Sequence, residues 1–157
     1  MGSVSTFLWF DNAAGEAVDL YTSLVPNSRI LDRQVLPEGS PAPGTVLSVT
    51  FELDGQRFQA INAGPQFSFT EAISIVVSVE DQAELDRLWD ALVADGGQES
   101  RCGWLKDRWG LSWQIVPSVL GSLLGGPDPE GGRRALQAML AMNRLDIQTL
   151  EEAYAGA

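Results

Sequence analysis

Phe7-Leu8-Trp9-Phe10 is a short apolar stretch followed by a helical pattern, and Ile73-Ser74-Ile75-Val76-Val77 opens the same arrangement again. In both patterns the apolar residues recur at i, i+3, i+4 and i+7, which marks one face of a helix. The two sets lie 68 positions apart: Ala17, Leu20, Tyr21 and Leu24, then Leu85, Leu88, Trp89 and Leu92. A strand followed by one amphipathic helix cannot bury its own apolar face. The sequence therefore predicts two copies of one module, packed around a pseudo-twofold cleft.

The rest of the chain extends each copy to β-α-β-β-β. Segments rich in β-branched and aromatic residues follow each helical pattern, and Asp54-Gly55 predicts a tight hairpin between two of them. We expect one domain over residues 1–157, with a first module at 4–64, a second at 71–118 and a helical tail at 128–155. The predicted fold class is α+β, with paired βαβββ modules and a C-terminal helix.

Polar residues mark where the helices begin. Asp11 or Asn12 is expected to cap the first helix, and Asp81 with Glu84 forms a capping box for the second. Asp128-Pro129 places a capping residue before a proline at the first helical position of the tail. The tail helix is expected either to dock on its own domain or to serve as a lid or dimer arm.

Composition excludes several classes of function. A net charge of −11 disfavours nucleic-acid binding, because neutralising phosphates requires clustered Lys and Arg. The acidity either serves solubility or steers a cationic ligand. The absence of histidine excludes Ser-His-Asp triads and His-containing zinc sites, and we expect no metal and no cofactor. No apolar run reaches the ~18 residues of a membrane span, and the lone Cys102 without an export signal predicts the cytoplasm.

Four polar residues at repeated positions are the main candidates for ligand binding. Thr6 and Ser74 lie at the start of the first strand of each module, and Gln59 and Gln114 each follow a hairpin glycine by four residues. Related by a pseudo-twofold, they are expected to meet on one sheet face. They either line a binding cleft or are ordinary polar residues of a sheet.

Further candidates surround these four. Asn62, a candidate ligand-binding residue, and Glu71 flank the linker between the modules, and Phe10 is expected to wall an apolar pocket or to fill core. Glu71 is the one carboxylate near the mouth of the predicted cleft, hence the one candidate general base. A four-residue turn at 107–110 would place Trp104 opposite Trp113. It would also put Gly103 beside Gln114, where the missing side chain leaves room for a ligand. We expect the charged turn itself to be solvated, and Phe67 and Phe69 to wall a pocket or fill core.

A family resemblance rests on several stretches of the chain. They are Phe7–Phe10, Ala60–Pro65, Phe69–Ser74 and the long Cys102–Pro117. The sequence resembles the PhnB-like branch of the vicinal oxygen chelate superfamily, often labelled 3-demethylubiquinone-9 3-methyltransferase, and this superfamily includes glyoxalases and bleomycin-resistance proteins. The resemblance implies a glyoxalase-like fold and a homodimer, with modules or arms that can be exchanged.

The resemblance also locates the departure from the superfamily pattern. In metal-using members the four positions supply His, Glu or Gln ligands, whereas here they read Thr6, Gln59, Ser74 and Gln114. Two hydroxyls and two amides suit a transition metal poorly. The first hypothesis is a metal-independent protein that binds a small aromatic or cationic molecule. The second is an isomerase- or lyase-type enzyme that uses Glu71 or an unusual metal site. A methyltransferase is disfavoured, because no glycine-rich strand-to-helix turn is present.

Overall fold

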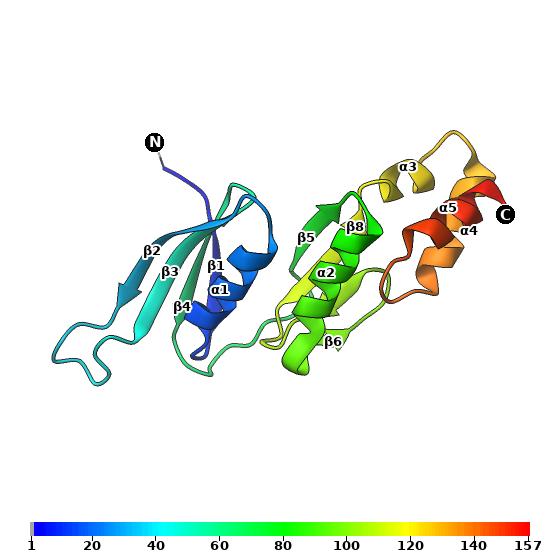
Figure 1. Cartoon of the computed structure of the whole chain (residues 1–157). Coiled ribbons are helices and arrows are strands. Elements are labelled where there is room, and N and C mark those ends of the chain that lie inside the picture. The colour runs from blue at the N-terminus through cyan, green and yellow to red at the C-terminus, as the bar shows by residue number, and fades with distance from the viewer. Residues whose placement is uncertain (1) are drawn as a thin grey trace. The chain divides into compact units, whose positions relative to one another are not determined.

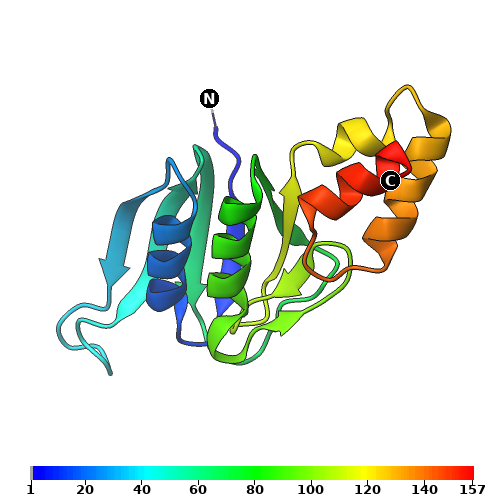
Figure 2. The same cartoon turned by 45° about the vertical axis from the view of Figure 1, so that its right-hand side comes forward.

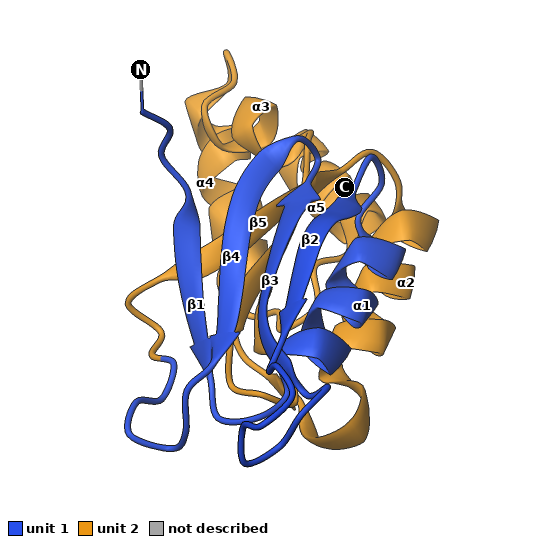
Figure 3. Ribbon diagram, turned by 90° about the vertical axis from the view of Figure 1, so that its left-hand side faces the viewer, with its two compact units in different colours: residues 1–69 blue, residues 70–157 orange. Residues whose placement is uncertain are grey.

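The computed structural model describes residues 2–157. The chain divides into two compact units, Met1–Phe69 and Thr70–Ala157 (Figures 1 and 3). Each unit contains one four-stranded sheet and at least one helix that packs on it. The two units are described separately below.

Unit 1 folds as β-α-β-β-β. Its elements are β1 (Thr6–Phe10), α1 (Ala14–Leu24), β2 (Arg29–Val35), β3 (Val46–Leu53) and β4 (Gln56–Asn62). The strand order is β1-β4-β3-β2, with β1 parallel to β4 and the other neighbours antiparallel. Asp54 and Gly55 both have positive φ and form the tight turn between β3 and β4, as the Asp-Gly dipeptide predicts.

Unit 2 repeats this topology and adds three helices. Its elements are β5 (Ser74–Val79), α2 (Gln82–Val93), a 3-10 turn (Ala94–Gly96), β6 (Gln98–Glu99), β7 (Trp104–Lys106), β8 (Ser112–Pro117), α3 (Leu120–Leu124), α4 (Pro129–Leu140) and α5 (Ile147–Ala155). The strand order β5-β8-β7-β6, with β5 parallel to β8, matches that of unit 1. The predicted α+β fold of paired βαβββ modules with a C-terminal helix is therefore confirmed.

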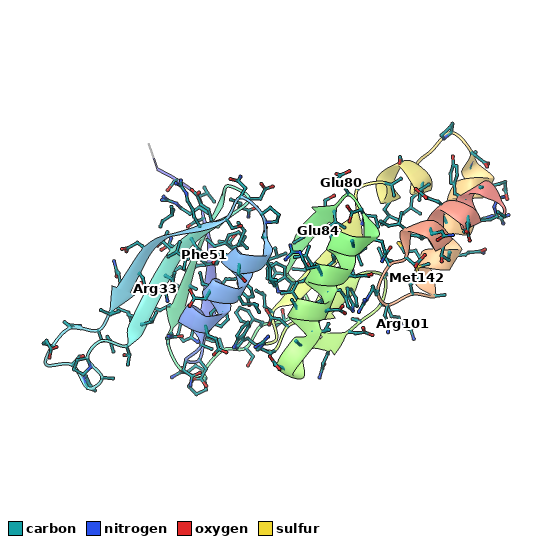
Figure 4. All side chains as sticks on the ribbon, in the orientation of Figure 1. Arg33, Phe51, Glu80, Glu84, Arg101 and Met142 are labelled. Carbon is teal, nitrogen blue, oxygen red and sulfur yellow. The ribbon has the colours of Figure 1, made fainter. Side chains whose placement is uncertain are left out.

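One face of the unit 1 sheet is packed against α1. Alternate residues of β3 and β4 point to this side and are buried, among them Val49, Phe51, Phe58 and Ala60. The rings of Phe51, labelled in Figure 4, and Phe58 stack at 5.3 Å between centroids. We call the opposite side the open face of unit 1. It carries Phe7, Trp9, Thr50, Gln59 and Ile61.

The unit 2 sheet is organised in the same way. Trp113 and Ile115 of β8 are fully buried on the side of α2, where the predicted helical stripe Leu85, Leu88, Trp89 and Leu92 is also buried. The intervening residues of each strand point away from α2. They form the open face of unit 2: Ser74, Val76, Trp104, Lys106, Ser112 and Gln114.

The helix starts agree with the sequence in two cases and differ in one. Asp81 accepts a hydrogen bond from the Glu84 amide at 2.8 Å, and Asp128 accepts one from the Glu130 amide, as predicted. The prediction that Asp11 or Asn12 caps α1 is wrong. The cap comes instead from β4, where Asn62 Oδ1 accepts from the Ala14 amide at 2.8 Å. A sequence pattern cannot reveal a capping group 48 residues away.

The turn between β7 and β8 is one residue longer than predicted. Lys106 pairs with Ser112, so Trp104 lies opposite Gln114 and Leu105 lies opposite Trp113. The expected pairing of Trp104 with Trp113 is therefore wrong. The extra residue is Leu111, whose amide donates to Asp107 Oδ1 at 3.0 Å and whose carbonyl accepts from the Asp107 amide.

Asp107 is also not solvated, in contrast to the prediction for this turn. It is 2% exposed. Besides Leu111, it accepts hydrogen bonds from the Trp109 amide at 2.9 Å and from Trp113 Nε1 at 3.0 Å. A buried carboxylate requires such partners, and here they fix the turn and anchor the Trp113 ring.

The C-terminal helices form a cluster within unit 2 (Figure 2). Backbone hydrogen bonds from Cys102 to Met142 and from Gly103 to Asn143 tie the α4–α5 connection to the loop before β7. Arg144 pairs with Asp86 and Asp90 of α2. The tail thus docks on its own unit, while Leu136 and Leu140 of α4 remain exposed.

Candidate functional site

Each open face carries the same hydrogen-bonded pair of side chains. In unit 1, Gln59 Nε2 donates to Ser5 Oγ at 2.8 Å. In unit 2, Gln114 Nε2 donates to Ser74 Oγ at 2.9 Å. In each case the glutamine comes from the last strand of the module, whereas Ser5 immediately precedes the parallel first strand β1 and Ser74 is the first residue of β5. The two modules thus build the same polar feature at corresponding positions.

The partner of Gln59 differs by one residue from the prediction. Thr6 pairs in register with Phe58, a buried residue on the α1 side, so Thr6 belongs to the helix-covered face. Ser5 takes the position that Ser74 holds in unit 2. Corresponding first-strand residues of the two modules are 69 positions apart in the sequence, as Ser5 and Ser74 are. Corresponding helix residues, such as Ala17 and Leu85, are 68 positions apart. The strand-to-helix connection of unit 2 is one residue shorter, and helical periodicity alone gives no sign of this.

Aromatic side chains surround the Ser5–Gln59 pair. Phe7 lies beside Gln59 in register and is 54% exposed. Trp9 makes an edge contact with Phe67 at 4.9 Å between ring centroids, and its Nε1 donates to the Gly64 carbonyl at 2.9 Å. The open face of unit 1 therefore offers apolar rings next to a neutral polar pair, which suits an aromatic or apolar ligand group.

The open face of unit 2 combines an aromatic ring with charge. Trp104 lies opposite Gln114, and Lys106, two residues further along β7, forms an ion pair with Glu71. The hydrogen bond from the Lys106 ammonium is the main reason that the pKa of Glu71 is lowered from its ordinary value. A lowered pKa makes a weaker base, so this geometry gives little support to Glu71 as a general base.

Two other candidate residues, Phe10 and Asn62, lie away from the Ser–Gln pairs. Phe10 is buried on the α1 side of the sheet and makes an edge contact with Phe69 at 5.1 Å between centroids. Asn62 caps α1 through its Oδ1, and its Nδ2 donates to the Val46 carbonyl at 3.0 Å. Both amide atoms of Asn62 thus have a structural role.

Gly103 does not lie beside Gln114, in contrast to the prediction. Its φ is +86°, and a Cβ atom there would meet the Ile115 carbonyl oxygen at 3.0 Å and Leu145 Cδ1 at 3.1 Å. The space left by the missing side chain is therefore filled by Leu145, which is fully buried. Gly103 serves the docking of the tail.

A hollow of about 550 Å³ lies at the start of α1. It is lined by Asn12, Ala13, Gly15, Glu16, Gly44, Thr45, Val46 and Asn62. Of the candidate residues only Asn62 borders this hollow, and its amide is already engaged. None of the lining residues belongs to the open face of unit 1, so the hollow is separate from that face.

The donor atoms on the open faces do not fit a transition-metal ion. Each Ser–Gln pair offers a hydroxyl and an amide oxygen, with neither an imidazole nor a carboxylate. Within residues 2–157, no group of three or more Cys, Asp or Glu side chains is placed to hold a metal ion. No helix in this range has the length and apolar character to cross a membrane.

Comparison with known proteins identifies the family to which the chain belongs. The profile of the 3-demethylubiquinone-9 3-methyltransferase family matches residues 2–116, which include both Ser–Gln pairs. The chain belongs to this family. A PhnB protein of Bacillus cereus that carries the same family description is 34% identical, with a TM-score of 0.68 over 74% of this chain and 100% of that one. The predicted membership of the PhnB-like branch is thereby confirmed.

More distant structures share the fold alone. A protein of Pseudomonas aeruginosa is 19% identical with a TM-score of 0.59, covering 74% of this chain and 98% of that one. A Bacillus cereus protein described as a possible glyoxalase is 14% identical with a TM-score of 0.50 over the same shares. No curated protein sequence matches the chain. The glyoxalase-like fold of this family member is therefore shown, while its activity has to be argued from its own residues.

Proposed function

We propose that this family member is a metal-independent protein that binds a small molecule on its open sheet faces. One observation carries the proposal. Both modules place a glutamine hydrogen-bonded to a serine near aromatic rings, which are the exposed Phe7 and the half-buried Trp9 in unit 1 and the half-buried Trp104 in unit 2. Apolar walls with a few oriented polar groups are the usual composition of a small-molecule site.

The repetition of the pair supports a selected feature rather than an ordinary polar surface. The flanking residues differ between the modules: Phe7 of β1 corresponds to Val76 of β5, and Thr50 of β3 corresponds to Trp104 of β7. The amide and hydroxyl are nevertheless kept together at 2.8 and 2.9 Å. Such a pair can turn its remaining donors and acceptors toward a ligand.

A methyltransferase activity receives no support from the architecture. Rossmann-type methyltransferases use a parallel sheet with a glycine-rich turn after its first strand. Here each sheet has one parallel pair only, and α1 follows β1 through Asp11-Asn12-Ala13. We therefore treat the family description as a label that does not state the activity of this chain.

Ligand screening by thermal shift and tryptophan fluorescence tests the proposal. We expect aromatic metabolites or cationic aromatic compounds to raise the melting temperature saturably, because a ligand that binds only the folded state stabilises it. Gln59→Ala and Gln114→Ala should each weaken the binding of such a hit. Gln148→Ala is the matched control, because Gln148 is an exposed glutamine of α5 that bonds only to Glu152.

The result of this screen separates the two hypotheses. Hits that bind equally well to the Gln59 and Gln114 variants would place the ligand elsewhere and contradict the proposal. Stoichiometric metal in the purified protein, lost together with a measurable turnover in Gln114→Ala, would instead favour the isomerase or lyase alternative. The lowered pKa of Glu71 weighs against that alternative.

We further propose that a second copy of the chain covers the open faces. Phe7 is 54% and Val76 is 57% exposed, and they occupy corresponding positions beside Gln59 and Gln114. Both residues lie on the edge strands β1 and β5 of their sheets, and exposed apolar residues grouped on a sheet face are typical of an interface. A homodimer would cover them.

The free thiol of Cys102 supports the cytoplasm as the proposed compartment.

A further inference from the structure

The open face of unit 2 carries the only lysine in the sequence, and every other basic residue is an arginine. Lys106 lies on β7, two residues from Trp104 and opposite Ser112. Lysine and arginine are not interchangeable, because the ammonium is a compact charge on a flexible stem whereas the guanidinium is a planar fork. A chain that otherwise uses arginine thus places its single ammonium beside the Ser74–Gln114 pair.

A hydroxyl without a partner lies next to this ammonium. Ser112 is 1% exposed, and its Oγ forms no hydrogen bond within the described structure. It pairs in register with both Lys106 and Ser74, so its side chain belongs to the open face of unit 2. A buried polar group without a partner costs free energy, and a bound acceptor would satisfy this one.

The present partner of Lys106 is the more exposed member of the ion pair. Glu71 lies in the turn before β5, and its side chain is 63% exposed, whereas Lys106 is held in β7 with a side chain 36% exposed. Exposed ion pairs contribute little to stability. The Glu71 carboxylate can therefore be displaced at small cost while the ammonium stays in place.

We propose that Lys106 recognises the carboxylate of an aromatic acid, that Ser112 donates a hydrogen bond to the same carboxylate, and that Glu71 occupies its place in the free protein. Trp104 provides the surface for the aromatic ring. The proposal rests on the proposed binding function, and it names the chemical class of the ligand. The net charge of −11 does not oppose it, because salt at physiological strength screens distant charges beyond about 8 Å.

The isosteric series benzoate, benzamide and benzamidinium tests this recognition in the full-length protein. Because the sequence has one lysine, protein labelled with ε-¹³C-lysine gives a single side-chain signal that needs no assignment. We expect benzoate to shift this signal saturably together with the indole signal of Trp104, identified from a Trp104→Phe sample. Benzamide and benzamidinium should shift it far less.

Three variants are expected to change the affinity for benzoate, one raising it and two lowering it. Glu71→Gln should bind benzoate roughly threefold more tightly, because the competing carboxylate is gone. Lys106→Met, which contains no lysine and is followed by the Trp104 indole signal, should bind it about tenfold more weakly or not at all. Ser112→Ala should bind it roughly threefold more weakly without a loss of thermal stability, whereas a purely structural role would leave binding unchanged. Glu84→Gln, which breaks an exposed ion pair with Arg87 on α2 (Figure 4), is the control and should bind like the unchanged protein.

The failures are distinguishable. If benzamide shifts the Trp104 signal as strongly as benzoate, the face binds aromatic ligands but anion recognition is overturned, and the proposed function stands. Anion recognition is also overturned if benzamidinium binds more tightly than benzoate and if Glu71→Gln weakens that binding. Glu71 would then be the recognition group. Absence of any benzoate-dependent shift overturns anion recognition as well, while the ligand screen still decides the proposed function.

Discussion

At the scale of single residues, Asp107 shows how a charged turn becomes part of the core. Its carboxylate accepts from two backbone amides and from the indole of Trp113, and these bonds set the length of the turn between β7 and β8. That length decides which side chains lie on the open face of unit 2. Residues 106–108 are all charged, and charged side chains are usually exposed, so the sequence favours a solvated turn. The hydrogen-bond donors that allow Asp107 to be buried cannot be recognised from the sequence.

We expect Asp107→Asn to lower the free energy of unfolding by about 2–3 kcal/mol. The asparagine amide keeps one acceptor oxygen, but its NH₂ group replaces the other. This NH₂ group would face an N–H donor that the Asp107 carboxylate accepts from in the unchanged protein. Urea denaturation followed by tryptophan fluorescence measures the change. Asp95→Asn is the control, since it removes only the exposed partner of Arg108 and should stay within about 0.5 kcal/mol. A loss in Asp107→Asn no larger than in the control would contradict the role given to Asp107.

At the scale of elements, α1 and α5 illustrate two kinds of helix start. The cap of α5 is local, because Asp146 accepts from the Thr149 amide at 2.7 Å. The cap of α1 is distant, because it comes from Asn62 on β4. The sequence therefore predicts the existence and type of α1 from its apolar stripe, but it cannot predict which group completes its first turn.

Replacing each candidate cap of α1 compares the two assignments directly. We expect Asn62→Ala to cost about 1–2 kcal/mol, because it removes both the cap and the bond to the Val46 carbonyl. Asn12→Ala should cost close to nothing, although Asn12 is the cap that the sequence suggests. Thermal and urea unfolding of both variants measures this, and equal losses would refute the assignment.

The cap of α5 predicts a pH dependence. The hydrogen bond from the Thr149 amide is the main cause of the lowered pKa of Asp146, whose ordinary value is 3.8. A group with a lowered pKa contributes stability above its unfolded pKa and loses it as the pH falls through the folded value. We expect the unchanged protein to lose this part of its stability below pH 3.8. Asp146→Asn, which keeps a neutral cap, should lack that part of the loss in parallel acid titrations by circular dichroism.

At the scale of the whole molecule, the predicted homodimer has a direct test. Light scattering coupled to size exclusion should give about twice the 16.9 kDa of one chain. Val76→Glu should shift the mass toward the monomer, because it buries a charge at the proposed interface. Leu140→Glu, on the exposed stripe of α4, should not. If only Leu140→Glu dissociates the dimer, the tail is the dimer arm and the open faces are not the interface.

The sequence was a good guide to topology and a poorer guide to side-chain placement. Periodicity predicts both βαβββ modules, because alternation and helical stripes follow directly from burial. The repeat also draws attention to Gln59, Ser74 and Gln114, which the structure places in the two Ser–Gln hydrogen bonds, while their role in ligand binding stays a prediction. Ser5 in place of Thr6, and Leu145 beside Gly103, depend on register and on contacts between distant segments. Neither can be predicted from the local sequence pattern.

The differing offsets of strands and helices have a consequence for where the two modules can differ in length. Ser5 to Ala17 spans one position more than Ser74 to Leu85, yet the parallel ladders of β1 with β4 and of β5 with β8 have the same arrangement. The difference lies in the connection between strand and helix, outside both ladders. We therefore expect a glycine inserted into the exposed connection at Asp11 to disturb the sheet of unit 1 less than one inserted within β1.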